Sequence, residues 1–165
     1  MNECKLSEIN WTKVAVFAGG DRGHYRTDFD CFVGVDRGSL WVLEEKLPLA
    51  LAVGDFDSVT VEEGQLIQER AQHFVQAQPE KDDTDLELAL LTIFEKNPQA
   101  QVTIFGALGG RIDHMLANVF LPSNPKLAPY MRQIEIEDGQ NLISYCPEGT
   151  SQLEPRLDYD YLAFM

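Results

Sequence analysis

The chain has 165 residues, a length that allows one complete domain plus a fragment, or two small domains. Its 13 Lys and Arg against 27 Asp and Glu give a formal net charge of −14, and no basic patch is segregated, so nucleic acid is not an expected partner. No apolar stretch approaches the roughly 20 residues that span a bilayer, and no secretory signal is visible, so we expect a cytoplasmic protein without a membrane segment.

Short apolar runs alternate with helix-like stretches as far as about residue 125. The expected strands cover residues 13–18, 31–35, 49–53, 73–76 and 101–105, and the expected helices cover residues 39–46, 61–72 and 84–96, with a short helix ending near Phe120. This alternation predicts an α/β fold, a Rossmann-like parallel sheet whose strands are joined by crossover helices on both faces. Continuous apolar runs such as residues 50–53 predict strands that are buried on both sides.

The clearest helix is the one over residues 84–96. Its apolar residues follow the spacing of one buried face, and they are Leu86, Ala89, Leu90, Ile93 and Phe94. Thr84 and Glu87 have the spacing of a capping box, which predicts that the helix begins at Thr84.

The pattern changes at Gln133 to alternating apolar and polar residues, broken by Asp138-Gly139 and Glu148-Gly149, as is typical of antiparallel hairpins. The prolines between residues 122 and 129 predict a linker. We therefore expect an α/β domain over residues 1–125 and a second, incomplete β-rich unit over residues 130–165, with a last apolar strand over residues 159–165.

The segment Gly-Asp-Phe-Asp-Ser at residues 54–58 directly follows a buried strand, where ligands of open α/β sheets bind. In an extended backbone Asp55 and Asp57 would project to the same side, where a hard cation such as Mg²⁺ would relieve their repulsion. The alternative is a solvated acidic turn.

A second acidic cluster, residues 81–85, lies at the start of the helix that begins at Thr84. Asp82 and Asp85 can share a helix face, Asp83 fits a capping role, and Lys81 lies beside them. Two acidic loops at one edge of a sheet favour a binding site over two unrelated turns.

A third element, residues 106–114, contains Gly106, Gly109 and Gly110 and then Arg111, Asp113 and His114. Glycines at a strand-to-helix turn let backbone N–H groups approach an anionic ligand, and an Arg fork suits phosphate. The segment lacks the Gly-Lys-Ser/Thr of a Walker loop.

Similar loops follow the first strand, with Gly20 and Asp21, and the second, with Asp36. His114 could contact substrate or pack at the helix start.

Together these motifs resemble the thiamine pyrophosphokinase family, which transfers a pyrophosphoryl group from ATP to thiamine and releases AMP. The resemblance covers roughly residues 13–121 and rests on residues 35–38, 54–58, 81–85 and 109–114, with Asn118. It implies a Rossmann-like catalytic domain followed by a β-sandwich, and a homodimer whose thiamine pocket lies between subunits. Family members continue beyond the position of Met165, so the resemblance also implies that this sequence lacks most of the sandwich.

The resemblance also implies roles for individual residues. Asp55, Asp57 and Asp85 match the Mg²⁺-binding and catalytic carboxylates, and Asp113 matches a position near the reacting hydroxyl. The positions expected around ATP are Gly20, Asp21, Asp36, Lys81, Asp82, Thr84, Gly110, Arg111 and His114. Asp36 is followed by Arg37 and Gly38 where many members have Asp-Gly-Gly, and His114 stands where some have Gln.

The charges predict the chemistry independently. ATP brings about four negative charges to an acidic site, so a divalent metal must neutralise both, and the substrate hydroxyl can attack directly while Asp57 or Asp113 accepts its proton. Two alternatives stay open. Asp-Phe-Asp after an apolar strand also matches haloacid-dehalogenase-type phosphatases, although their motif follows the first strand of the fold, and an inactive nucleotide- or thiamine-binding module is the other alternative.

Overall fold

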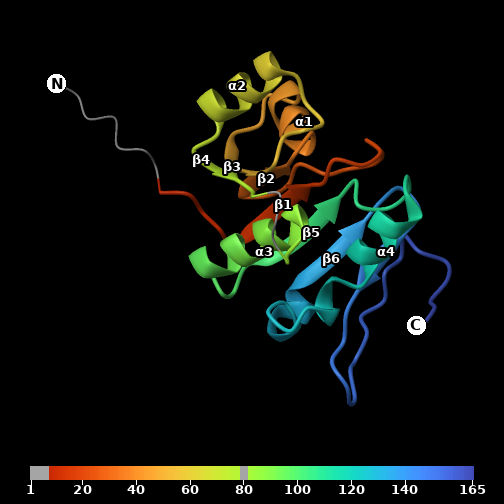
Figure 1. The fold of residues 1–165 in the computed structure, drawn as a ribbon. Helices are drawn as coiled ribbons and strands as arrows, with labels where there is room; N and C mark the ends of the chain where they lie inside the picture. Colours follow the sequence, from red (N-terminus) through yellow and green to blue (C-terminus); the bar gives the residue numbers. More distant parts are fainter. Residues whose placement is uncertain (1–7, 79–81) are drawn as a thin grey trace.

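A computed structural model of the chain describes residues 8–78 and 82–165 and shows a twisted sheet with helices on both faces (Figure 1). Its elements are β1 (Lys13–Phe17), β2 (Cys31–Val35), α1 (Gly38–Glu44), β3 (Leu49–Gly54), α2 (Val61–Arg70), β4 (His73–Gln76), α3 (Asp85–Lys96), β5 (Gln101–Phe105), α4 (Ile112–Val119), the 3-10 helices η1 (Leu121–Ser123) and η2 (Ala128–Gln133), β6 (Ile134–Glu137) and β7 (Leu142–Ser144). The described strands form one sheet in the order β4-β3-β2-β1-β5-β6-β7. Strands β1 to β6 run parallel and β7 is antiparallel to β6, so the predicted α/β class is confirmed.

The strands and helices predicted from residue 13 to Phe120 are present, with bounds that differ by at most two residues. The capping box at Thr84 is formed, and the five apolar residues assigned to one face of α3 are all buried. These elements were predictable because periodicity and capping depend on residues close together in the chain. Among the described residues, no helix is both long and apolar enough to cross a membrane.

Two apolar layers sandwich the sheet, because successive side chains of each strand point to opposite faces. On one face Val14 and Val16 of β1 join the buried side chains of α3. On the other face Ala15 and Phe17 join buried residues of α1 and α2. Burial on both faces accounts for the continuous apolar runs of the central strands.

The connection from β1 to β2, residues 18–30, contains no helix, and none was predicted in this stretch. We call it the β1–β2 loop. Tyr25 and Phe29 of this loop pack on the same apolar layer as α1 and α2, with Tyr25 against Phe17 and Phe29 against Phe105. Aromatic side chains thus cover this part of the sheet without a helix.

The segment predicted as a linker contains η1 and η2 and buries Leu121 and Leu127 in the α3 layer. Strand β6 then pairs with β5 in parallel, so the sheet continues past residue 130, and the division into two domains stays a prediction. The hairpin expected at Asp138-Gly139 is confirmed by the β6–β7 pair.

The strand expected over residues 159–165 is wrong. These residues have no strand pairing, and Tyr161 and Phe164 are exposed. Around Glu148-Gly149 no strand pair forms either. Alternation marks residues able to form a strand, but a strand also needs a neighbour with free backbone groups, which alternation does not report.

Candidate active site

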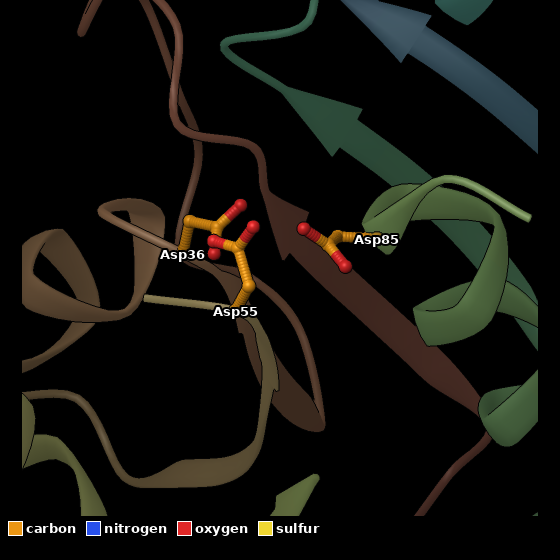
Figure 2. Close-up of side chains that lie close together, drawn as sticks. All are labelled: Asp36, Asp55 and Asp85. Carbon is orange, nitrogen blue, oxygen red and sulfur yellow. The ribbon is translucent and has the colours of Figure 1, made fainter. Parts of the chain in front are cut away.

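Three carboxylates meet at the edge of the sheet where the parallel strands end. Asp36 follows β2, Asp55 follows β3, and Asp85 is the first residue of α3. Each offers an oxygen, and these oxygens lie within 4.8 Å of one another. Figure 2 shows the three side chains converging on one point from three different elements. Oxygen ligands in this arrangement suit a hard divalent cation.

The backbone at Asp36 explains how its carboxylate reaches the cluster. Asp36 has a left-handed φ of 47°, and its backbone N–H donates to the Val53 carbonyl at 2.9 Å. Its Oδ1 accepts a hydrogen bond from the Phe56 N–H at 3.1 Å. A Cβ atom at Gly54 would lie 2.0 Å from the same Oδ1, so only glycine leaves room for the carboxylate.

The environment of Asp36 favours its neutral form. Burial raises the pKa of Asp36 to about 7, the Phe56 N–H opposes that rise, and the negative charges of Asp85 and Asp55 add to it. A bound divalent cation would lower the pKa of Asp36, because positive charge favours the charged carboxylate over the neutral form.

Asp57 lies outside the carboxylate cluster, because the expected extended backbone over residues 55–57 is wrong. Phe56 has a left-handed φ of 58°, and its ring stacks on Phe74 with centroids 4.9 Å apart. The Asp57 N–H donates to Asp55 Oδ1 at 3.1 Å, and the residue is exposed. The aromatic stack breaks the alternation that would have put both carboxylates on one side.

The start of α3 orders the second acidic segment. Thr84 accepts a hydrogen bond from the Glu87 N–H, and Glu87 accepts one from the Thr84 N–H. Asp83 pairs with Lys126 at 2.6 Å. Asp82 is exposed, and the predicted ATP contact Lys81 lies outside the described residues.

Two of the loops assigned to ATP lie against each other. The Gly20 N–H donates to the Gly106 carbonyl at 3.1 Å. A Cβ atom at Gly109 would lie 3.2 Å from Asp21 Oδ2, whereas one at Gly110 would meet open space. Gly109 and Gly110 have positive φ values of 86° and 68°, which glycine adopts without strain.

Arg111, the residue before α4, pairs with Asp113 through bonds of 3.2 and 2.7 Å. The Arg111 hydrogen bond lowers the pKa of Asp113. Both side chains are exposed, at 72% and 61%, and His114 is exposed as well, so this basic end of α4 is open to a ligand.

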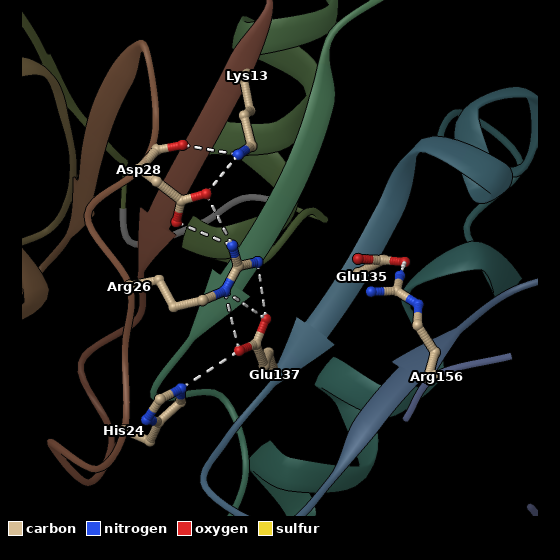
Figure 3. Close-up of polar contacts among 7 residues, drawn as sticks. All are labelled: Lys13, His24, Arg26, Asp28, Glu135, Glu137 and Arg156. Atoms are coloured by element: carbon tan, nitrogen blue, oxygen red, sulfur yellow. Dashed lines mark hydrogen bonds and ion pairs between the residues drawn. The ribbon is translucent and has the colours of Figure 1, made fainter. Parts of the chain in front are cut away.

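The β1–β2 loop that carries Gly20 and Asp21 is anchored by ion pairs (Figure 3). Arg26 Nε donates to Glu137 Oε1 and Oε2 at 3.1 and 3.2 Å, and its Nη2 donates to Oε2 at 3.0 Å. Its Nη1 donates to Asp28, which also accepts from Lys13. His24 Nε2 lies 3.4 Å from Glu137 Oε1. Glu137 is the last residue of β6, so the anchor joins the loop to the same edge of the sheet as the carboxylates.

From the sequence, Asp36 was expected beside the nucleotide and not in the carboxylate cluster, and Gly54 was noted only as part of a motif. The signal for Asp36 was its position directly after a buried strand adjacent to β3. The structure thus joins Asp36, Asp55 and Asp85 and leaves Asp57 and Asp113 outside that group.

An open parallel sheet with acidic side chains and a glycine loop (residues 106–110) at its carboxyl edge is typical of α/β proteins that bind an anionic ligand together with a cation. Residues 23–133 match the family described as "Thiamin pyrophosphokinase, catalytic domain". The chain is 35% identical over 158 residues to the thiamine pyrophosphokinase of Bacillus subtilis, an alignment that spans 92% of this chain and 72% of that protein. The chain therefore belongs to the thiamine pyrophosphokinase family.

Solved structures agree with this assignment. A thiamin pyrophosphokinase family protein from Enterococcus faecalis is 48% identical, with a TM-score of 0.79 over 84% of this chain and 67% of that one. The thiamin pyrophosphokinase from Geobacillus thermodenitrificans is 37% identical, with a TM-score of 0.63 over 79% of this chain and 61% of that one. The matches thus span about three fifths to two thirds of these solved chains.

We predict that Gly54→Ala weakens Mn²⁺ binding at least about tenfold, because the new methyl group displaces the Asp36 carboxylate. Gly64→Ala in α2 is the matched control, since its Cβ would meet only Val59 at 3.9 Å, and it should leave binding unchanged. Calorimetric titration with Mn²⁺ measures both variants. If Gly54→Ala and the unaltered chain bind Mn²⁺ with equal affinity, the close approach of Asp36 to Gly54 does not control the metal site.

We predict that cation binding strengthens as the pH rises from about 5 to about 8 and releases about half a proton per ion at pH 7, because the ion competes with the proton on Asp36. Without the metal ion, a rise in pH has the opposite effect on the folded chain. The raised pKa of Asp36 contributes to the free energy of unfolding at low pH, and this contribution is lost as the pH rises through about 7. Calorimetry in buffers of different ionisation enthalpy counts the protons. Asp36→Asn should abolish the release, and a release that persists in this variant would assign it to another group.

We predict a coupling free energy of about 2 kcal/mol between Arg26 and Glu137, because the Glu137 side chain is only 9% exposed and accepts several charged hydrogen bonds. The exposed pair Arg156–Glu135, also drawn in Figure 3, is the control and should couple by about 0.5 kcal/mol. Urea unfolding of the Arg26→Met and Glu137→Gln single and double variants, and of the same changes at the control pair, gives both values. Equal coupling free energies in the two pairs would show that Glu137 stabilises the β1–β2 loop no more than an exposed ion pair would.

Proposed function

We propose that the chain binds ATP and Mg²⁺ at the carboxyl edge of its sheet and transfers a pyrophosphoryl group from ATP to the hydroxyl of thiamine, releasing AMP. The observation that carries this proposal is the convergence of Asp36, Asp55 and Asp85 at the same edge of the sheet as the glycine loop. The names of the relatives support the choice of thiamine.

The donor set fits Mg²⁺. The carboxylate oxygens of Asp36, Asp55 and Asp85 are hard ligands and lie close enough to share one ion. When no ion is bound, burial raises the pKa of Asp36 to about 7. When bound, Mg²⁺ would neutralise charge on ATP and on the phosphate oxygens during transfer.

The phosphates would lie along the glycine loop. Gly110 leaves room for a ligand to approach the backbone, and Arg111 offers paired donors at the start of α4. Gly20 and Asp21 border the same loop, and His114 lies on the exposed first turn of α4. Asp82 and Thr84 would border the nucleotide from the start of α3.

In the transfer step the thiamine hydroxyl oxygen bonds to the β-phosphorus, and the bond from that phosphorus to the oxygen bridging to the α-phosphorus breaks, so AMP leaves. The hydroxyl proton passes to a carboxylate. Both carboxylate oxygens of Asp113 already accept hydrogen bonds from Arg111. Asp57, exposed beside Asp55, is therefore the preferred acceptor.

The phosphatase alternative would make Asp55 a covalent nucleophile. It is not favoured, because Asp55 belongs to a cluster built from β2, β3 and α3, and the relatives are thiamine pyrophosphokinases. An inactive binding module would bind ATP without turnover. Metal-dependent release of AMP that requires thiamine distinguishes the proposed enzyme from both alternatives.

We also propose a homodimer in the cytoplasm. Ile112, Leu116 and Phe120 form an exposed apolar stripe along α4, a feature typical of association surfaces. Cys31 and Cys146 are free thiols, as is usual in a reducing compartment. Light scattering during size exclusion would report the assembly.

We predict that Asp55→Asn weakens Mn²⁺ binding at least about tenfold and abolishes AMP release, because it removes one of three shared ligands. Asp57→Asn should keep Mn²⁺ binding and lower turnover by about 100-fold or more, because it removes only the proton acceptor. Calorimetry and an AMP assay with and without thiamine separate these effects. If Asp57→Asn loses Mn²⁺ as Asp55→Asn does, Asp57 is a ligand instead.

A further inference from the structure

The segment between α4 and β6 touches the start of α3, although about forty residues separate them in the chain. Asn124 Nδ2 donates to Asp83 Oδ1 at 3.1 Å and to Glu87 Oε1 at 3.0 Å. Lys126 Nζ donates to Asp83 Oδ2 at 2.6 Å. One amide therefore bridges carboxylates on either side of the Thr84 cap.

The position of Asn124 is fixed from its own side. Leu121 and Leu127 are buried in the apolar layer that includes α3. The Asn124 Oδ1 accepts from the Lys126 N–H at 3.0 Å, and the Asn124 carbonyl accepts from the Leu127 N–H at 2.9 Å. The amide is thus held by a segment that is packed against the core.

Glu87 uses both of its oxygens at the start of the helix. Oε2 accepts from the Thr84 N–H at 2.7 Å, and Oε1 accepts from Asn124. The residue that follows Thr84 is Asp85, whose carboxylate belongs to the candidate metal cluster. Any shift of the Thr84 cap therefore moves Asp85 relative to Asp36 and Asp55.

We propose that Asn124 is a positioning residue for the metal site, which holds the first turn of α3 so that Asp85 faces Asp36 and Asp55. This inference rests on the proposed function, because it requires that the cluster binds a divalent cation. Lys126 has a smaller part, since its side chain is 58% exposed and solvent screens its pairing with Asp83. The half-buried amide of Asn124 makes the direct connection to both carboxylates.

The first experiment compares two asparagines at opposite ends of α3. Asn124→Ala should weaken Mn²⁺ binding about tenfold while thermal unfolding still shows a folded chain. Asn97→Ala is the matched control, because Asn97 is also half-buried and bonds a distant segment, the Trp11 carbonyl at 3.1 Å, but at the far end of the helix. It should bind Mn²⁺ as the unaltered chain does.

The second experiment tests the hydrogen bonds themselves. Asn124→Asp should bind Mn²⁺ more weakly than Asn124→Ala, because its carboxylate faces Asp83 and Glu87. Adding Glu87→Gln should recover binding, since the Gln oxygen can still cap Thr84 while its amide donates to the new carboxylate. A merely structural loss would not be recovered in this way.

Each outcome has a defined meaning. Normal Mn²⁺ affinity in folded Asn124→Ala, or equal losses in Asn124→Ala and Asn97→Ala, would overturn the positioning role and leave the metal site intact. Failure of the unaltered chain to bind Mn²⁺ at pH 8 would overturn the metal site and the positioning role together.

Discussion

Repulsion among three carboxylates is the constraint on which the candidate site depends. Asp36, Asp55 and Asp85 are brought within 4.8 Å by elements whose positions are set by the core of the sheet, so the side chains cannot separate to relieve their charge. Burial raises the pKa of Asp36 to about 7, and the negative charges of Asp85 and Asp55 add to that rise. A cation bound among the three carboxylates would relieve their mutual repulsion.

Topology explains why these residues meet. Strands β2 and β3 are parallel neighbours, so the residues that follow them emerge side by side. Helix α3 packs against this pair, and its first residue, Asp85, faces Asp36 and Asp55 from the opposite side (Figure 2). The loops after β1 and β5, which are also neighbours, supply the adjoining glycine-rich surface. The carboxylate cluster and the glycine-rich loops are therefore brought to one edge by the order of four strands.

Features encoded by near neighbours in the chain were predictable, and features encoded by distant contacts were not. The α3 face and its capping box follow from spacings of three and four residues. The left-handed turn at Phe56 depends on a ring that arrives from β4, and the place of Asp36 depends on Gly54 from the next strand. Local periodicity carries no information about either contact. The role of Asn124 was invisible for the same reason, because its partners lie about forty residues earlier.

The helix-free β1–β2 loop has a consequence for motion. Its backbone makes few ladder hydrogen bonds, and side-chain ion pairs and aromatic contacts hold it in place of a helix. Such a segment can open as a unit once the contacts of Tyr25 and Phe29 and the Arg26 ion pairs break, while the central strands keep their ladder hydrogen bonds. Any ligand that binds the ordered form of the loop must then slow the exchange of its amide hydrogens with solvent, so that occupancy of the site and order of the loop rise together.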